Sequence, residues 1–248
     1  AFYFLVLLLK ISPFILTGLF VFLFYKFKFF EIISKMRGYY KNKKIDFGLF
    51  ISIFYLGYIV FMVIAPKKID RYIIFTYPVF AYLAYSGYEF FLNRLKNKIV
   101  GLLFTIFIFL VFVLFPIIRV FPWYFTYTSP IFGSTSFANM IVGQKSFGVG
   151  IPYLKKYILE TYKEEPKIGF YDTQPMRAVY PNSKIFDVRV YGPGTYDVLI
   201  LSINEEMPEK ILSNGEYSFE KSHSIWINGL EYWRIYNKIT LSENNNGK

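Results

Sequence analysis

The sequence predicts a polytopic α-helical membrane protein with about four spans, followed by a small extracytoplasmic α/β domain. Two long runs carry no charge, residues 47–65 and residues 99–118. At about 1.5 Å per residue, each run is long enough to cross roughly 30 Å of hydrocarbon. After Arg119 the pattern changes to short apolar stretches separated by turn residues. We therefore predict a transmembrane helical region over 1–118 and an α/β domain over 119–248.

The net charge of +11 is concentrated in the first half of the chain. Residues 1–118 contain 14 Lys and Arg against 4 Asp and Glu, whereas residues 119–248 contain 14 against 13. A nucleic-acid partner would require a basic face on a soluble module, and the second half is nearly neutral. The composition therefore argues against nucleic acid as a partner. Cysteine is absent, which excludes disulfides and thiolate metal sites.

The orientation of the spans follows from the loops between them. The predicted spans cover about 12–28, 47–65, 72–92 and 99–118. Seven Lys or Arg residues lie within 26–44 and three within 93–98, so the positive-inside rule places these two loops in the cytoplasm. The loop 66–71 then faces outward, and so does everything after Arg119.

The N-terminal stretch needs its own interpretation, because residues 1–9 are apolar and end at Lys10. A charge in the middle of a bilayer costs on the order of 3 kcal/mol, so we expect Lys10 at the outer interface. Residues 1–9 are then an interfacial helix or the end of an earlier span, and Pro13 begins the next helix. The chain shows no charged signal-peptide region, which favours a C-terminal piece of a longer membrane protein.

The second half predicts alternating helices and strands. Asn228-Gly229 between two apolar runs is a strong hairpin signal, because both central residues of a type I′ turn need positive φ. The predicted elements are a helical region at 136–163 interrupted near Gly148 and Gly150, strands at 167–171, 183–190 and 197–203, a helix at 207–213, and a hairpin formed by 224–227 and 230–236.

Motifs for soluble enzyme chemistry are missing. The only histidine, His223, lies on a predicted strand between two serines, and an ordinary strand residue is the simpler interpretation. No G-x-S-x-G elbow and no phosphate-binding glycine loop is present. We therefore predict no catalytic residue, metal or cofactor in this sequence.

The predicted outer loop is the exception, since it gathers cations where a span meets the lipid headgroups. It contains Lys67, Lys68 and Arg71 against a single carboxylate, Asp70. Lysine and arginine at that depth can hold a phosphate group, arginine through two parallel hydrogen bonds. Simple anchoring at the interface explains the same residues equally well.

Several segments, in the same order along the chain, resemble the bacterial and archaeal glycosyltransferases of the protein O-mannosyltransferase and aminoarabinose transferase type. The matching segments are LLLKISP (7–13), PKKIDRYIIFTYPVFAYLA (66–84), PWYFTYTSPIFGS (122–134), GQKSFGVGIPYLKK (143–156) and INGLEYWRIY (227–236). The sequence departs from the family pattern at Phe75, where a proline is usual, and at Gln144 and Lys145.

The resemblance implies a membrane glycosyltransferase of the GT-C fold in a prokaryotic plasma membrane. Such enzymes take a sugar from a polyprenyl-phosphate donor on the outer face of the membrane. Their catalytic carboxylate lies in a first outer loop, upstream of this sequence, so we expect the chain to be inactive alone. Whether a longer enzyme would use a divalent metal is left open by the resemblance. The expected partners are the polyprenyl-phosphate-linked sugar, membrane lipid and an acceptor that is a lipid, a glycan or a protein.

The donor phosphate and its lipid are assigned to residues at the predicted outer face. We expect the phosphate to contact Arg71 and Lys68 first, then Lys10 and Lys67, and Tyr72 to line a lipid groove. The alternative function is a non-catalytic scaffold or receptor subunit with an extracytoplasmic binding domain. A transporter fragment is a third possibility, but it would require more charged or broken spans near the midplane.

Overall fold

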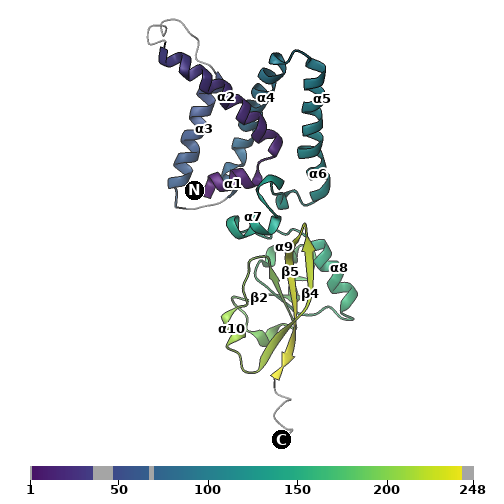
Figure 1. Ribbon diagram of the computed structural model, residues 1–248. Coiled ribbons are helices and arrows are strands. Elements are labelled where there is room, and N and C mark those ends of the chain that lie inside the picture. The colour runs from purple at the N-terminus through teal and green to yellow at the C-terminus, as the bar shows by residue number, and fades with distance from the viewer. Residues whose placement is uncertain (1, 36–46, 67–69, 242–248) are drawn as a thin grey trace. The chain divides into compact units, whose positions relative to one another are not determined.

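A computed structural model describes residues 2–35, 47–66 and 70–241 (Figure 1). The chain divides into two compact units, unit 1 (Ala1–Val142) and unit 2 (Gly143–Lys248). The division falls after Val142, whereas the domain boundary expected from the sequence falls after residue 118.

Unit 1 is helical. Its elements in chain order are α1 (Phe2–Lys10), α2 (Pro13–Lys35), α3 (Phe47–Ile64), the 3₁₀ segment η1 (Asp70–Thr76), α4 (Tyr77–Arg94), α5 (Lys98–Phe109), the π-helical turn η2 (Leu110–Leu114), α6 (Phe115–Val120), the 3₁₀ turns η3 (Tyr124–Thr126) and η4 (Pro130–Phe132), and α7 (Thr135–Val142).

The prediction of a polytopic membrane protein with about four spans is wrong. Within the described residues, only Lys98–Val120 forms a helix that is long and apolar enough to cross a membrane. Phe2–Lys10 and Pro13–Tyr25 pass the same test only as a pair, and they are bent by 115°. One or two such helices are weak evidence for a membrane protein.

Two of the other predicted spans differ from a long membrane-crossing helix in length or in where the helix begins. Helix α3 has 18 residues and is about 27 Å long, which is at the lower limit for crossing the roughly 30 Å of a hydrocarbon core. The predicted span 72–92 starts in the 3₁₀ segment η1, and its α-helix α4 begins only at Tyr77 and includes Glu89 and Arg94. Hydropathy along the sequence therefore misplaced the start of the helix in the run 72–92, which begins only at Tyr77.

The helix Lys98–Val120 has a π-helical turn in its middle, and its cause is Pro116. Proline has no N–H, so the carbonyl of Phe112, four residues earlier, loses its usual helical donor. Ser12 Oγ, at the bend between α1 and α2, donates to that carbonyl oxygen at 2.8 Å. A serine from a neighbouring segment thus supplies the hydrogen bond that the proline removes, as is common in apolar surroundings.

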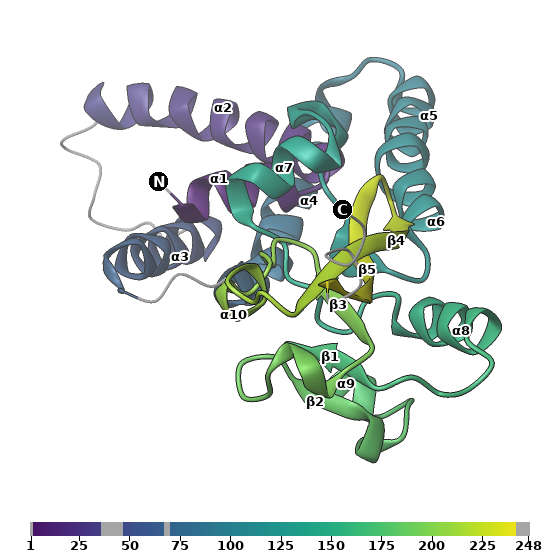
Figure 2. The same cartoon turned by 90° about the horizontal axis from the view of Figure 1, so that it is seen from below.

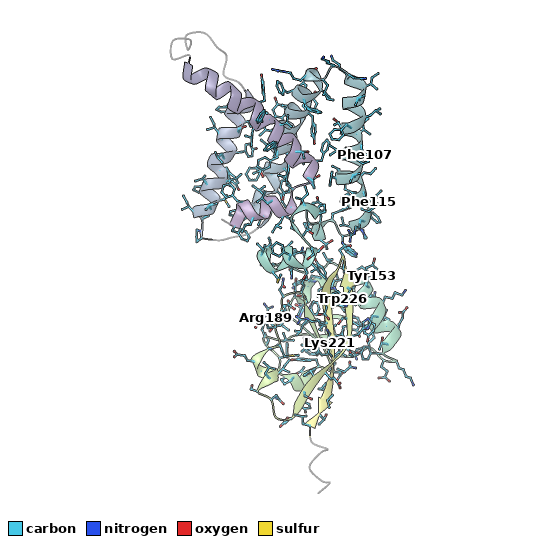
Figure 3. All side chains as sticks on the ribbon, in the orientation of Figure 1. Phe107, Phe115, Tyr153, Arg189, Lys221 and Trp226 are labelled. Carbon is cyan, nitrogen blue, oxygen red and sulfur yellow. The ribbon has the colours of Figure 1, made fainter. Side chains whose placement is uncertain are left out.

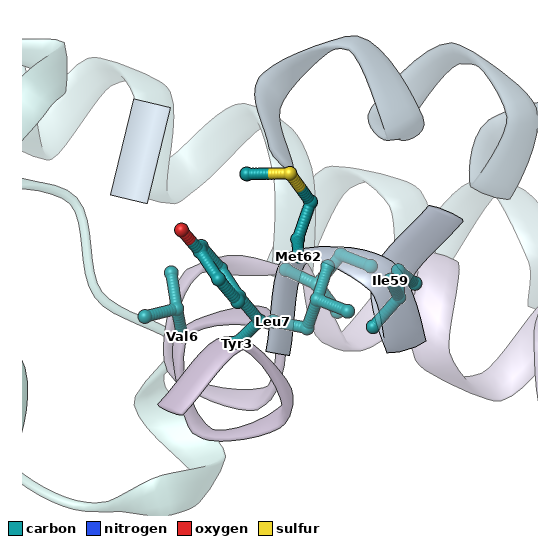
Figure 4. Close-up of a cluster of buried hydrophobic side chains, with 6 residues drawn as sticks. Tyr3, Val6, Leu7, Ile59 and Met62 are labelled. Carbon is teal, nitrogen blue, oxygen red and sulfur yellow. The ribbon is translucent and has the colours of Figure 1, made fainter. Parts of the chain in front are cut away.

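Helices α2 and α4 approach each other closely because glycines lie at their contact. A Cβ atom added to Gly87 would lie 2.1 Å from the carbonyl oxygen of Gly18, and one added to Gly18 would lie 2.7 Å from Cβ of Ala84. Small residues at a helix contact let the backbones meet, which is the usual packing of apolar helices. A second cluster joins α1 to α3 (Figure 4); its buried members are Tyr3, Val6, Leu7, Ile11, Ile59 and Met62.

Unit 2 contains a five-stranded mixed sheet in the order β2-β1-β3-β5-β4. Its elements are α8 (Ile151–Thr161), β1 (Ile168–Phe170), α9 (Thr173–Arg177), η5 (Asn182–Lys184), β2 (Ile185–Asp187), η6 (Pro193–Thr195), β3 (Val198–Ser202), α10 (Glu209–Leu212), β4 (Tyr217–Ile227) and β5 (Leu230–Thr240). Strand β1 is parallel to both β2 and β3, and β5 is antiparallel to both β3 and β4. The predicted small α/β fold and its strands are confirmed for this unit.

The sheet is covered on both faces, and α8 and α10 lie on opposite sides of it (Figure 2). Ile211 of α10 packs with Leu199 and Leu201 of β3. On the other face, Trp233 of β5 stacks on Phe170 of β1, with ring centroids 5.4 Å apart. All five residues of β3 are buried, as expected for a central strand covered on both faces.

The predicted hairpin is confirmed. Ile227 pairs with Leu230 across a two-residue loop, and both loop residues have positive φ, 49° at Asn228 and 79° at Gly229. These angles match a type I′ turn, whose twist suits the flanking strands. The predicted helical region 136–163 consists of two helices, α7 and α8. The residues that connect them, 143–150, lie beside one edge of the sheet and are described with the functional site.

Candidate functional site

The residues assigned to the donor phosphate fall into three groups in the structure. Lys67 and Lys68 lie outside the described residues. Arg71 and Tyr72 belong to the 3₁₀ segment η1. The Tyr72 side chain is exposed, and its backbone carbonyl accepts a hydrogen bond of 3.0 Å from the hydroxyl of Tyr58 on α3.

Lys10, the third assigned phosphate contact, ends α1 and holds a loop. Its Nζ donates to the carbonyl oxygens of Tyr127 at 3.0 Å and of Phe125 at 3.2 Å. The backbone N–H of Ser129 donates to the Leu9 carbonyl at 2.7 Å, which attaches the same loop to the end of α1. Helix α1 also contacts η1. The structure thus brings the helix that carries Lys10 against the segment that carries Arg71 and Tyr72.

Unit 1 contains an apolar groove of about 530 Å³ between α2, α4 and the long helix Lys98–Val120. Its lining residues are Phe14, Ile15, Ala81, Ala84, Tyr85, Tyr88, Glu89, Leu92, Asn93, Thr105, Phe109 and Val113. Phe14 stacks on Tyr88 at 4.6 Å and meets the edge of Phe109 at 5.5 Å, so aromatic rings form its floor.

The two ends of this groove differ in polarity. One end carries the side chains of Glu89, Asn93 and Thr105. The other end, at Val113, lies beside Phe112, whose carbonyl is held by Ser12. Ser12 belongs to the bend two residues after Lys10, so the Lys10 end of α1 lies near the apolar end of the groove.

Unit 2 has a polar cavity of about 370 Å³ at the carboxyl edge of its parallel strands. Asp172 follows β1, and Ile203, Asn204 and Glu205 follow β3. The other wall is the connecting segment 143–147, which contributes Gly143, Gln144, Lys145, Ser146 and Phe147. In sheets with parallel strands, ligands usually bind at this edge.

Three hydrogen bonds of 2.8 Å fix the connecting segment against the sheet. Asn204 Nδ2 donates to the carbonyl of Gln144, the Tyr232 hydroxyl donates to Gln144 Oε1, and Trp233 Nε1 donates to the carbonyl of Val149. Burial raises the pKa of Tyr232 to about 12, so its hydroxyl keeps its proton at neutral pH and remains a donor. The wall of the cavity is therefore rigidly attached.

Positive φ angles concentrate around this cavity. They occur at Gly143, Phe147, Gly148 and Gly150 in the connecting segment, and at Asn204 on the opposite wall. For Phe147, with φ of 41°, this conformation is unfavourable by about 1–2 kcal/mol. Backbone strain of this kind occurs most often at functional sites.

Sequence reasoning missed both cavities. Gly148 and Gly150 were expected to interrupt the helical region, and they do lie between α7 and α8, but the sequence did not indicate that the residues just before them line a cavity. Asn204 after a buried strand was the other available signal, because asparagine tolerates positive φ. No sequence pattern indicated the apolar groove, since the composition of its lining residues does not differ from that of any lipid-facing helix.

His223 has the structural role expected from the sequence. Its ring stacks on Tyr157 of α8, with centroids 4.2 Å apart and planes inclined by 7°. Over the part of the chain that the structure describes, no three His, Cys, Asp or Glu side chains are grouped so that they could hold a metal ion.

Comparison with known proteins gives no further identification. No family model, no curated protein and no solved structure matches the chain significantly.

Proposed function

We propose that the chain is part of a membrane-attached glycosyltransferase that uses a polyprenyl-phosphate-linked sugar, and that the apolar groove of unit 1 holds the prenyl chain. The helix Lys98–Val120 attaches unit 1 to the bilayer. The groove is the observation that carries the proposal, because its long, mainly apolar lining suits a hydrocarbon chain better than a polar ligand.

The exposed face of the long helix supports membrane attachment. Only 6% of its most apolar 18-residue window is buried inside the protein. Phe107 and Phe115, labelled in Figure 3, are each 62% exposed, and Ile99 is 70% exposed. Large exposed apolar patches on a protein mark sites of contact with lipid or other proteins.

The groove itself supports a hydrocarbon ligand. Each buried CH₂ group contributes about 0.8 kcal/mol, so a prenyl chain of several isoprene units gains substantial binding energy without any polar contact. Lys10 lies two residues before Ser12, which binds the Phe112 carbonyl beside the Val113 end of the groove, and it is the first proposed phosphate contact, although its Nζ also donates to the carbonyl oxygens of Phe125 and Tyr127. Arg71, on the segment that contacts α1, is the second proposed phosphate contact.

Photolabelling tests the lipid assignment. The full chain in nanodiscs is irradiated with a diazirine-bearing polyprenyl phosphate, and labelled peptides are identified by mass spectrometry. We expect labelling on α2, α4 and α5. Ala81→Trp fills the groove and should reduce this labelling about fivefold or more, whereas Gly57→Trp on α3, where an added Cβ meets nothing within 4 Å, should not. Equal labelling of both variants would overturn the assignment.

Sugar transfer tests the catalytic part of the proposal. In the membranes of cells that express the native protein, Arg71→Ala should lower the rate of transfer from a polyprenyl-phosphate-linked sugar by about 10²-fold, because a fixed cation at the leaving phosphate is lost. The matched control is Arg177→Ala on α9, which should leave the rate unchanged. If prenyl labelling persists but the native protein transfers no sugar, the protein is a lipid-binding scaffold instead.

A further inference from the structure

The polar cavity of unit 2 is built entirely from residues of that unit and plays no part in the proposed prenyl binding. Its position follows from the topology of the sheet. Strand β1 lies between β2 and β3, and all three are parallel. The cavity opens at the carboxyl ends of β1 and β3.

The segments that leave these two strand ends go to opposite faces of the sheet. After β1 the chain enters α9, whose Pro175 lies against Gly148 on the α8 side; a Cβ at Gly148 would be 3.4 Å from Cβ of Pro175. After β3 the chain enters α10, whose Ile211 packs on the other face with Leu199 and Leu201. Diverging connections leave a crevice between adjacent strands, and this is where sheets of this kind bind ligands.

The lining chemistry limits the class of ligand. Two carboxylates, Asp172 and Glu205, line the cavity together with one ammonium group, Lys145. The charge of this lining set is −1 at neutral pH, and the guanidinium of Arg234 donates to the carbonyl oxygens of Ser202 and Glu205 at the same edge, so among the described residues of the lining itself Lys145 is the one cation that an anion would meet. A neutral ligand that offers several hydroxyl donors can instead donate to both carboxylates and accept from Lys145.

The walls also suit a ligand with one apolar face. Phe147 is 45% exposed at the cavity, and its ring can cover the C–H face of a sugar ring. The volume of about 370 Å³ lies at the small end of the usual range for ligand sites. One Glu205 oxygen accepts from the backbone N–H of Ser202 at 2.7 Å, which orients the carboxylate beforehand.

We infer that the unit 2 cavity binds a pyranose, with the carboxylates of Asp172 and Glu205 accepting hydrogen bonds from sugar hydroxyls and Phe147 packing against the ring. Lys145 donates to a further oxygen. This site is distinct from the groove of unit 1 and does not depend on a transfer reaction.

The test uses the full chain in nanodiscs and saturation-transfer NMR with the methyl pyranosides of mannose, glucose, galactose and N-acetylglucosamine. At least one pyranoside should bind. Asp172→Ala should weaken that binding about tenfold, because a hydrogen bond to a charged acceptor is lost. Asp172 is exposed and its side chain does not cap α9, so this variant should fold normally.

Phe147→Gly is the second variant, and it separates binding from folding. Glycine suits the positive φ at this position, so the backbone should be retained while the ring is lost. Binding should fall about fivefold, since the contact of the aromatic ring with the sugar is lost. Glu164→Ala, an exposed carboxylate beyond the end of α8, is the matched control and should bind like the native chain.

Three outcomes overturn the inference. The first is that none of the pyranosides binds. The second is that Asp172→Ala and Phe147→Gly bind as tightly as Glu164→Ala. The third is that inorganic phosphate binds in place of every pyranoside, which would make the cavity an anion site. Because prenyl labelling is measured on unit 1, failure of this site leaves that result untouched, and the converse also holds.

Discussion

Unit 1 and unit 2 use aromatic and aliphatic side chains in opposite ways. In unit 2 several of the largest are buried, with Trp233, Tyr196, Tyr232 and Phe170 each at most 1% exposed, although Trp226 is 64% exposed. In unit 1 many side chains of the same kind are exposed along the helix Lys98–Val120. Unit 2 is therefore stabilised by excluding water from its own core, whereas unit 1 leaves a large apolar surface exposed along one helix.

The sharpest way to break this comparison is to remove one large side chain from each unit. Trp233→Ala should destabilise unit 2 by about 3–5 kcal/mol, because it leaves a cavity and removes the 2.8 Å hydrogen bond to Val149. Phe107→Ala in unit 1 should change the stability of unit 2 by less than about 0.5 kcal/mol. Hydrogen exchange of the β3 amides in the full chain measures both values.

The comparison fails if Phe107→Ala accelerates exchange in β3 as much as Trp233→Ala does. That result would mean that the exposed residues of the long helix support the core of unit 2. A null effect of Trp233→Ala would contradict the assignment of the core itself.

Within unit 1, the close contact between α2 and α4 should contribute to stability alongside the buried cluster that joins α1 to α3. Gly87→Leu places a side chain where a Cβ would already lie 2.1 Å from the Gly18 carbonyl, so α2 and α4 must separate. We expect a loss of about 1–3 kcal/mol. Gly57→Leu on α3, where an added Cβ meets nothing within 4 Å, is the matched control. Thermal unfolding in nanodiscs, measured as loss of the protease resistance of unit 1, compares the two variants. Equal resistance of Gly87→Leu and Gly57→Leu would refute the packing argument.

The hairpin of unit 2 gives a smaller effect. Gly229 has φ of 79°, so Gly229→Ala should cost about 1–2 kcal/mol. Gly215→Ala should change stability by no more than about 0.5 kcal/mol, because Gly215 has no left-handed φ and open space around it. Urea unfolding of the full chain, monitored by tryptophan fluorescence, compares them. If both substitutions have the same cost, the turn does not need its left-handed backbone.

The sequence predicted unit 2 better than unit 1, because the patterns that indicate the elements of unit 2 involve residues that are close together in the sequence. The hairpin at Asn228-Gly229 and the buried strand 198–202 are local patterns that fix their own geometry. The prediction of about four spans is wrong because, within the described residues, only Lys98–Val120 is a single helix long and apolar enough to cross a membrane, and hydropathy does not reveal the 3₁₀ segment before Tyr77. Both cavities join residues far apart in sequence, such as Gln144 and Asn204, so no local pattern could indicate them.

The smallest effect concerns charge on the surface of unit 2. A side-chain hydrogen bond from Arg189, with its positive charge, lowers the pKa of Asp187; the two groups are 2.7 Å apart. A carboxyl whose pKa is lower in the folded state than in the unfolded chain adds stability above about pH 4, and this stability is lost as the pH falls through the folded-state pKa. Arg189 is 64% exposed, so solvent screening limits the contribution to about 1 kcal/mol or less.

Arg189→Gln should therefore lower the melting temperature slightly at neutral pH and leave it unchanged in strong acid, where Asp187 is protonated in both states. The matched control is Lys156→Gln on α8, which breaks a 3.8 Å pair with Glu160 whose side chains are 71% and 65% exposed. Because that pair is longer and almost fully hydrated, its loss should have no measurable effect at either pH. An Arg189→Gln effect that persisted in acid would show that its hydrogen bond to the Tyr171 carbonyl, at 3.0 Å, and not the charge pair, stabilises this edge of the sheet.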